Sequence, residues 1–340
     1  MRTVDHMPLI NASSNGNVLP LYIYEPSIIE ADDYDPRHHQ FINESLTSLN
    51  NSLNTIGGNL HIRKGEAVDI FQEILDEYGK SISIYSHEET GNWISYQRDI
   101  ELKKWCAKNL IEWHEFQQHG VQRPIQSRDG WSYEWNKFMN RPILEKPLDI
   151  SFVSLSKKLE LIAPSDIGKE ITHGDIQLGG REEAKKILES FLYERGQNYS
   201  KEMSSPLTAM TSCSRLSPYL TFGCISIKEV YQAAKARKEY LKGQKNIGYW
   251  RSSISSFSGR LRWHCHFIQK LEDQPDIEWS NMARAYDNIR DDFNDAHFEA
   301  WKSGQTGFPF IDANMRYLNH HGYINFRMRA MLVSFASYDL

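Results

Sequence analysis

The 340-residue chain is poor in cysteine, and the few that it has are scattered. Cys106, Cys213, Cys224 and Cys265 form no Cys-x-x-Cys pair, which excludes a zinc ribbon and a disulfide framework and indicates reduced thiols. The segment WHCHF at 263–267 contains potential metal ligands. Because residues two apart on a helix do not share a face, and no second ligand cluster completes a tetrahedral set, we predict no metal site.

Long apolar runs are also absent. No run approaches the roughly 20 residues that a membrane helix needs, and the opening MRTVDHMPLI has no apolar stretch before a cleavage site. We therefore expect no membrane association and a cytoplasmic location. The net charge of -5 provides no overall attraction for a polyanion, so such a ligand needs a local basic patch.

Several well-known catalytic motifs are missing. The sequence contains no GxGxxG between a strand and a helix, no nucleophile elbow, no HExxH and no Walker sequence. A conventional dinucleotide site is therefore excluded, and hydrolytic or ATP-driven reactions have no support. Any chemistry would depend on a bound cofactor.

Residues 1–116 alternate short β-rich runs with helical patterns, in a chain long enough for about two domains. Apolar residues recur at helical spacing within 65–79, where Gly79 is placed to end the helix. The strand, helix, strand order predicts an α/β domain with a doubly wound, Rossmann-like parallel sheet. Its expected strands are residues 18–24, 60–63, 82–85 and 111–116.

The pattern then changes twice. Residues 117–180 have prolines at 124, 142, 147 and 164 and no sustained period, so we predict an irregular connector between domains. Residues 181–196 place apolar side chains on one stripe, with acidic residues in the first turn and Gly196 at the end. Further helices are expected over 295–304, 311–322 and 325–340, and residues 181–340 are predicted to form an all-helical domain.

One segment of the helical half is strongly basic. Residues 226–270 contain ten Lys or Arg against two Glu, a local charge of +8. A solvated lysine-rich helix face would explain the charge. A nucleic-acid groove would also explain it, because aromatic residues for stacking bases are interleaved with the basic ones: Tyr249, Trp250, Phe257, Trp263 and Phe267. The sequence leaves both interpretations open.

The segment TSCSRLSPYLTFGCIS, residues 211–226, combines hydroxyl groups with an arginine. Ser217 is placed to cap a helix that has Pro218 at its first position. That role leaves Ser212, Ser214 and Arg215 unexplained, and a pyrophosphate held by hydroxyl and backbone N–H groups would use all three.

Three blocks of the sequence together resemble one family. They are GGREEAKKILESFLYERGQNYSKEMSSPLTAMTSCSRLSPYLTFGCIS, GRLRWHCHF and AHFEAWKSGQTGFPFIDANMRYLNHHGYINFRMRAMLVSFASYDL. The chain resembles the cryptochrome/DNA photolyase family, most specifically in W-x-x-G-x-T-G-[FY]-P-x-[IV]-D-A-x-M-R-x-L. RKGEAVDIF and the pair Arg98 and Asp99 are similar to that family's antenna domain. The resemblance covers nearly the whole chain and implies that the family's first strand and last helices are missing from it.

The resemblance implies a flavoprotein that acts on DNA. In the repair members, excited reduced FAD passes an electron to a pyrimidine dimer flipped out of DNA, and the dimer splits. The chain would then be a DNA photolyase-type carbon–carbon lyase located with the genomic DNA, and its partner would be damaged DNA. The α/β domain would hold an antenna chromophore of folate or deazaflavin type, which the sequence does not identify.

The resemblance assigns binding residues to this chain by their positions in the family's motifs. It assigns no catalytic residue. Phe257 replaces a flavin-contacting Trp, Arg329 would lie near the flavin ring, and Trp263 would pack on the flipped lesion. The expected FAD contacts are Tyr199, Ser212, Cys213, Ser214, Arg215, Leu216, Ser217, Phe257 and Arg329. The expected DNA contacts are Arg260, Trp263, His264, Phe326 and Arg327.

Several positions depart from the family pattern. Arg260 stands where dimer-repairing members carry a carboxylate or amide, Phe326 replaces an asparagine, and Ala330 replaces a methionine. Asp291 replaces an exposed tryptophan. These departures leave two alternatives to repair: a cryptochrome-like blue-light photoreceptor that signals to a partner protein, and a flavin-free DNA-binding remnant.

Overall fold

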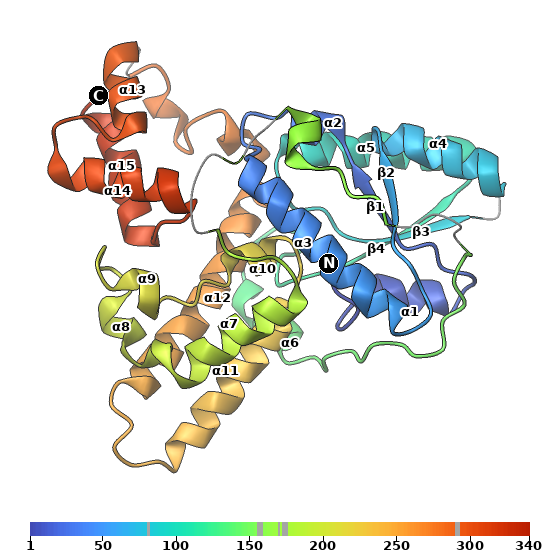
Figure 1. Cartoon of the computed structure of the whole chain (residues 1–340), viewed down its shortest axis with the longest axis horizontal. Helices are drawn as coiled ribbons and strands as arrows, with labels where there is room; N and C mark the ends of the chain where they lie inside the picture. Colours follow the sequence, from blue (N-terminus) through green and yellow to red (C-terminus); the bar gives the residue numbers. More distant parts are fainter. Residues whose placement is uncertain (80–81, 155–158, 169–170, 172–175, 290–292) are drawn as a thin grey trace.

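A computed structural model describes residues 1–79, 82–154, 159–168, 171, 176–289 and 293–340. The first half of the chain forms an α/β part, drawn in blue and cyan in Figure 1, and the second half forms a helical part, drawn from green to red. Helix α3 (Pro36–Asn54) runs along the boundary between the two parts. The combination of an α/β domain and a helical domain agrees with the predicted fold class.

The α/β part contains four short strands in two parallel pairs. Strands β1 (Leu21–Tyr24) and β2 (His61–Lys64) pair with Leu21 opposite His61. Strands β3 (Ser83–His87) and β4 (Glu112–Phe116) pair with Ser83 opposite Glu112. All four lie at the predicted places, and the parallel pairing is confirmed. Within the described residues the strands form two separate hydrogen-bonded pairs, whereas the sequence predicted a single sheet.

Helices cover both pairs of strands (Figure 1). Helix α4 (Ala67–Tyr78) has Gly79 as its C-cap at φ 80°, which confirms the helix end predicted from the sequence. Asp35 and Asn92 begin α3 and α5 by accepting hydrogen bonds from backbone N–H groups of the first turn. The remaining helices of this part are α1 (Met7–Ser13), α2 (Pro26–Ile29), α4 (Ala67–Tyr78) and α5 (Trp93–Asn109).

The segment 117–180 is less irregular than predicted, because it contains helix α6 (Trp131–Met139). Four aromatic and apolar residues of α6 recur at helical spacing: Trp131, Trp135, Phe138 and Met139. They are buried in the same core cluster as residues of α7 (Arg181–Tyr193), α11 (Ile227–Lys242) and α12 (Trp250–Asp273). The four prolines that suggested a connector all lie outside this helix. Helix α6 therefore packs with the helical part. The sequence did not predict it, because the residues around it show no sustained period and the helix is stabilised by the burial of its aromatic side chains.

Helix α7 (Arg181–Tyr193) confirms the predicted apolar stripe, although it ends three residues before Gly196, which lies in a 3₁₀ turn. The helices expected over 295–304, 311–322 and 325–340 are also confirmed, as α13 to α15. The other elements are η1 (Pro164–Ile167), η2 (Arg195–Asn198), α8 (Tyr199–Glu202), α9 (Ala209–Ser212), α10 (Ser217–Thr221), α11 (Ile227–Lys242), α12 (Trp250–Asp273), η3 (Pro275–Glu278), η4 (Arg284–Tyr286), α13 (Asp295–Ser303), α14 (Pro309–His321) and α15 (Phe326–Tyr338).

The two parts are joined where the start of α7 meets α3. The backbone N–H of Gly179 donates to a Glu44 carboxylate oxygen at 2.5 Å, and that of Gly180 donates to Ser45 Oγ at 3.0 Å. A Cβ atom on Gly179 would collide with the backbone oxygen of Phe41. Glycine is thus required here because the chain passes directly against the neighbouring helix. In the described residues, no helix is long and apolar enough to cross a membrane.

Candidate functional site

The loop between α9 and α10 is organised by Arg195. Its guanidinium donates to the carbonyl oxygens of Ser214 at 2.7 Å and Thr211 at 3.1 Å, and also to that of Cys213. Further bonds reach the Ile187 carbonyl at 3.2 Å and Ser190 Oγ at 3.0 Å at the end of α7. Arg195 therefore satisfies the carbonyl groups on one side of the loop and ties the loop to α7.

The other side of the loop presents N–H groups. In the described part of the chain, the backbone N–H groups of Ser214, Arg215 and Leu216 donate to no protein acceptor. Arg215 has a φ of 60°, in the left-handed region. Gln177 fixes this conformation, because it accepts from Arg215 Nε and donates to the Arg215 carbonyl, both at 3.0 Å. Since backbone N–H groups in folded proteins are normally paired, this row of donors can bind an anion.

Positive charge surrounds the same loop. The Arg215 guanidinium lies 4.0 Å from the ring centre of Tyr323. Burial raises the pKa of the Cys213 thiol, and this effect is opposed by a hydrogen bond with Tyr323 and by the charges of Arg195, Arg215 and Arg260. Cys213 is therefore a neutral thiol, and the charges of three arginines act on it.

Two tyrosines line the same region. Burial raises the pKa of Tyr199 to about 12, and a hydrogen bond from Arg260 acts in the opposite direction. Burial also raises the pKa of Tyr323, while the charges of Arg215 and Arg329 lower it. Both phenols are protonated at neutral pH and can donate hydrogen bonds. The loop, the tyrosines and the arginines together can hold a polyanion with an aromatic part; we call them the polyanion site.

The other predicted FAD contacts lie at different depths. Ser212 is buried and donates its hydroxyl to the Glu202 carboxylate, so it is already engaged. Leu216 and Phe257 are buried core residues, with the Phe257 ring 4.6 Å from that of Phe191. The expectation that Ser217 caps α10 was wrong: Leu216 precedes the helix and no side chain caps it. Ser217 instead is exposed at a pocket.

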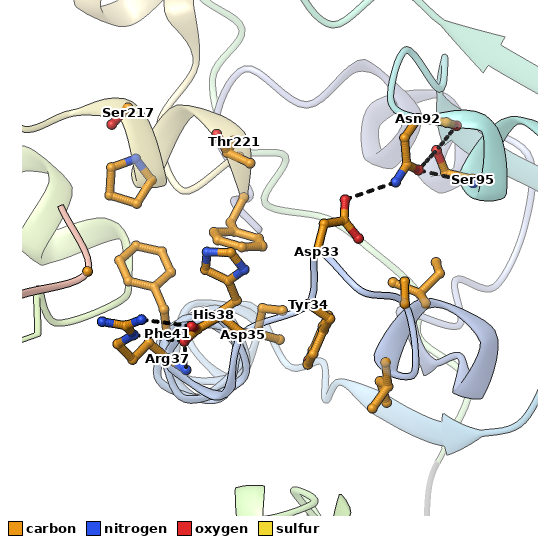
Figure 2. A pocket seen from close by; sticks show the side chains of 18 of the residues that line it. Asp33, Tyr34, Asp35, Arg37, His38, Phe41, Asn92, Ser95, Ser217 and Thr221 are labelled. Atoms are coloured by element: carbon orange, nitrogen blue, oxygen red, sulfur yellow. Dashed lines mark hydrogen bonds and ion pairs between the residues drawn. The ribbon is translucent and has the colours of Figure 1, made fainter. Parts of the chain in front are cut away.

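That pocket is a cavity of about 980 Å³ between the α/β part and the helical part. Figure 2 shows Ser217 and Thr221 on α10 facing Arg37 and His38 on α3. Asp33 accepts a hydrogen bond from Asn92 at 3.2 Å across the pocket wall. Its volume falls at the upper end of the range of ligand pockets. Arg215, Tyr323 and Arg329 also line it, so the polyanion site and the cavity are continuous.

A carboxylate network reaches the same cavity from the α/β part. Arg98 forms ion pairs with Glu25, Glu89 and Asp99, each at 2.9 Å. Burial raises the pKa of Glu25, and within the described residues its Oε2 atom has no hydrogen-bond partner. The Arg98 and Asp99 pair was noted from the sequence, but Glu25 and Glu89 were missed because no local pattern connects residues so far apart. Glu25 Oε2 can accept a hydrogen bond from a ligand N–H group.

The predicted DNA contacts divide into two groups. Arg260, Trp263, Phe326 and Arg327 are exposed, with the Arg260 guanidinium 5.2 Å from the Trp263 ring centre. His264 turns inward, and burial lowers its pKa to about 4. The exposed members come from α12 and α15 and lie on the molecular surface.

The basic segment 226–270 is less of a patch than its sequence suggests. Lys228 is buried in an ion pair with Asp5 at 2.7 Å. Arg251 donates to the carbonyls of Leu241 and Lys242, and Arg262 donates to Asn136 at 3.0 Å. Of the interleaved aromatic residues, Trp250 and Phe257 are buried, while Tyr249, Trp263 and Phe267 are exposed. Among the other departures from the family pattern, Ala330 is exposed on α15, and Asp291 lies outside the described residues.

Comparison with family models decides the classification. Residues 1–134 match the model of DNA photolyase, and residues 257–340 match the FAD binding domain of DNA photolyase. The chain belongs to the cryptochrome/DNA photolyase family. Members of this family contain the α/β and helical domains that the structure shows.

Individual relatives are distant but align along most of the chain. The deoxyribodipyrimidine photo-lyase of Halobacterium salinarum is 25% identical over 366 residues, covering 100% of this chain and 74% of the relative. Cryptochrome DASH of Xenopus laevis is 24% identical, covering 95% of this chain and 65% of the relative. Both photolyases and cryptochromes are therefore similar to this chain, which spans about two thirds to three quarters of their length.

Solved structures give the same picture. A photolyase of Sulfolobus tokodaii, described with two FAD molecules, matches with a TM-score of 0.76 and 27% identity over 98% of this chain and 72% of its own. A Synechocystis cryptochrome matches with a TM-score of 0.82 and 23% identity over 98% of this chain and 72% of its own. In the described residues, no cluster of three or more His, Cys, Asp or Glu is arranged to hold a metal ion.

Proposed function

We propose that the protein is an FAD-dependent enzyme that repairs pyrimidine dimers in DNA under blue light, as a DNA photolyase-type lyase. The observation that carries this proposal is the loop 213–217, where three backbone N–H groups donate to no acceptor within the described residues and the charges of Arg195, Arg215 and Arg260 act on Cys213. The Arg260 guanidinium also lies over the ring of the exposed Trp263. The family match to an FAD binding domain supports the choice of cofactor.

The residues at the loop suit the pyrophosphate of FAD. The N–H groups of Ser214, Arg215 and Leu216 and the Arg215 guanidinium would bind its oxygens. Ser212 would support the loop through Glu202 and would not touch the phosphates. Cys213, which is partly buried, is a weak hydrogen-bond donor and would contribute little.

When bound in its reduced state, FAD supplies the excited electron that splits a dimer. The residues of this chain would position the cofactor and the lesion and would set the electrostatic field around them. Arg329 would provide a fixed positive charge near the flavin ring. Trp263 would pack on the flipped lesion, and Arg260 would donate to a pyrimidine carbonyl, although it cannot accept a hydrogen bond from the base.

A cryptochrome-like photoreceptor is the second candidate. It is favoured by Arg260, Phe326 and Ala330, which replace residues that dimer-repairing members use. A photoreceptor would need the same flavin site and a signalling partner protein in place of damaged DNA. The part of the cavity lined by Glu25 and Arg98 would serve either function as the site of a second chromophore, of folate or deazaflavin type, whereas Arg215, Tyr323 and Arg329 in the same lining would belong to the flavin site.

The experiment that tests the proposal is repair under illumination. The purified protein is first checked for bound FAD by its absorption spectrum, and is then illuminated with DNA that carries a defined cyclobutane or (6-4) lesion. We expect light-dependent restoration of one lesion, loss of repair with retained FAD in Trp263→Ala, and normal repair in Tyr240→Ala. Retained, reduced FAD without restoration of either lesion would reject repair and leave the photoreceptor.

A further inference from the structure

Three exposed tyrosines meet on one surface of the helical part. Tyr193 is the last residue of α7, Tyr240 lies near the end of α11, and Tyr249 directly precedes α12. Their exposed fractions are 55%, 60% and 45%. We call the surface that these three residues form the tyrosine surface. In Figure 1 the loop that joins α11 to α12 lies at the opposite end of the helical part from α13 to α15, so the tyrosine surface lies away from the predicted DNA contacts on α15.

Arg237 lies at the centre of the tyrosine surface. Its guanidinium carbon is 4.6 Å from the ring centre of Tyr193 and 5.3 Å from that of Tyr240. The ring centre of the buried Trp250 is 5.1 Å away, and Arg237 Nε donates to the Leu192 carbonyl at 3.0 Å. Within the described residues, the two terminal nitrogens of Arg237 have no hydrogen-bond or ion-pair partner. The guanidinium is therefore held in one orientation while its outer edge stays available to a ligand.

The charge around the tyrosine surface is positive. Residues 235–245 contain five Lys or Arg against one Glu, a local charge of +4 in a chain whose net charge is -5. That glutamate, Glu239, already forms an ion pair with a lysine at 2.8 Å. Lys201 adds a further cation, with its ammonium 3.6 Å from the ring centre of Tyr249, and the exposed Glu194 offsets only one of these charges. The surface is thus complementary to an acidic ligand.

The composition of the tyrosine surface is typical of contacts between proteins. Tyr, Trp and Arg are enriched at the centres of protein interfaces, where they supply most of the binding energy. A stacked nucleobase would need open ring faces, but Arg237 covers a face of Tyr193, and Lys201 covers a face of Tyr249. A carboxylate needs only the outer edge of the guanidinium, which can bind it through two parallel hydrogen bonds. The geometry therefore favours an acidic polypeptide over a nucleic acid.

We propose that the tyrosine surface binds an acidic segment of a partner protein, with Arg237 pairing to a carboxylate of that segment and the tyrosine rings packing against its apolar side chains. Because the Leu192 carbonyl and the neighbouring rings already orient Arg237, binding loses little entropy in ordering it. The surface would serve a repair enzyme and a photoreceptor equally, so the inference does not depend on which of these functions is correct.

The test measures binding of a defined peptide in the dark. The probe is a fluorescein-labelled peptide that alternates glutamate with leucine, and its control is the same peptide with glutamine in place of glutamate. Fluorescence anisotropy with the whole protein should show binding of the glutamate peptide and binding of the glutamine peptide that is at least about 10-fold weaker. Arg237→Gln should weaken binding of the glutamate peptide about 10- to 150-fold, the range for loss of a hydrogen bond to a charged group.

Further variants separate geometry from charge. Arg237→Lys keeps the charge but loses the planar fork, so it should bind the glutamate peptide nearly as weakly as Arg237→Gln. Tyr193→Ala should weaken binding about fivefold or more, whereas Tyr193→Phe, which keeps the ring, should retain it. Tyr286→Ala removes a similarly exposed tyrosine from η4 and should change nothing. Added salt should weaken binding by the wild type more than binding by Arg237→Gln.

Folding of each variant is checked by thermal unfolding, and the exposed Tyr193 provides a second test if Arg237→Gln proves unstable. Equal binding of the two peptides, or unchanged binding in the folded Arg237→Gln or Tyr193→Ala protein, would overturn the proposal. Tighter binding of a labelled oligothymidine that Arg237→Gln abolishes would also overturn it and assign the surface to nucleic acid. A dimer in sedimentation that Arg237→Gln dissociates would overturn it in favour of a second copy of this chain.

Discussion

Arg195 is the residue on which the proposed flavin loop most depends. Its guanidinium forms five hydrogen bonds, to three carbonyls of the loop and to Ile187 and Ser190 on α7. In Arg195→Lys the charge is kept, but a single ammonium group cannot match the planar fork that spans these oxygens. The substitution therefore tests geometry at constant charge.

The expected loss can be estimated from these bonds. A hydrogen bond to a charged group contributes about 1.5–3 kcal/mol, and water can replace part of it at the exposed Thr211 carbonyl. Lysine would retain one or two of the five bonds, and water would satisfy most of the groups that it releases, because the Thr211 carbonyl is exposed and the others are only partly buried. We therefore expect a net loss of about 2 kcal/mol, concentrated in the loop. If that cost lowers the population of the ordered loop, the apparent affinity for FAD falls by about 30-fold.

The assay is the fraction of FAD that remains with the protein after dialysis against decreasing FAD concentrations, read from its visible absorbance, together with thermal unfolding. Arg251→Lys is the matched control, because Arg251 also donates to two backbone carbonyls, at the end of α11. We expect Arg251→Lys to lose stability but to keep FAD. Normal FAD affinity in Arg195→Lys, or equal FAD loss in both variants, would refute the reasoning.

Two further predictions concern stability. Gly179→Ala should lower the free energy of unfolding by more than about 2 kcal/mol in denaturant titration, because its Cβ would collide with the backbone of Phe41 and push α7 from α3; Gly243→Ala, whose Cβ meets nothing within 4 Å, is the control. Burial lowers the pKa of His119 to about 3, so below about pH 6.5 the imidazole is protonated in the unfolded chain but stays neutral in the folded protein. The free energy of unfolding should therefore fall by up to about 1.4 kcal/mol per pH unit between pH 6.5 and pH 3. A His119→Gln protein with the same dependence on pH would contradict this.

The sequence predicted most elements that are defined by local periodicity. The strands and α7 were found because their apolar residues repeat within one element, and α13 to α15 because their stripes end at glycine or at the chain's last residues. Helix α6 was missed because four prolines dominated the composition of its surroundings. Its apolar positions are aromatic and are buried against α11 and α12, so the decisive information was tertiary.

The candidate site was only partly predictable for the same reason. The sequence singled out residues 211–226 by their hydroxyl groups and arginine. In the structure Ser212 already donates to Glu202, so the backbone N–H groups of the loop 213–217 are the available donors. Arg195 and Glu25 were missed because their contacts join residues far apart in the chain. The charge count also overestimated how much positive charge the segment 226–270 exposes. Lys228, Arg251 and Arg262 are engaged by Asp5, backbone carbonyls and Asn136.

Arg260 connects the proposed flavin site with Trp263, the proposed lesion contact. On one side its hydrogen bond and charge act on Tyr199 and Cys213, and on the other its guanidinium covers the ring of Trp263. A carboxylate at this position would add negative charge beside the proposed pyrophosphate loop, whereas arginine adds positive charge to both sites. Because an anion bound at either site neutralises part of the charge of this shared cation and repels a second anion, cofactor and DNA should weaken each other's electrostatic attraction, most clearly at low salt. The replacement that removes the usual hydrogen-bond acceptor for a dimer thus couples the two proposed sites through a single charge.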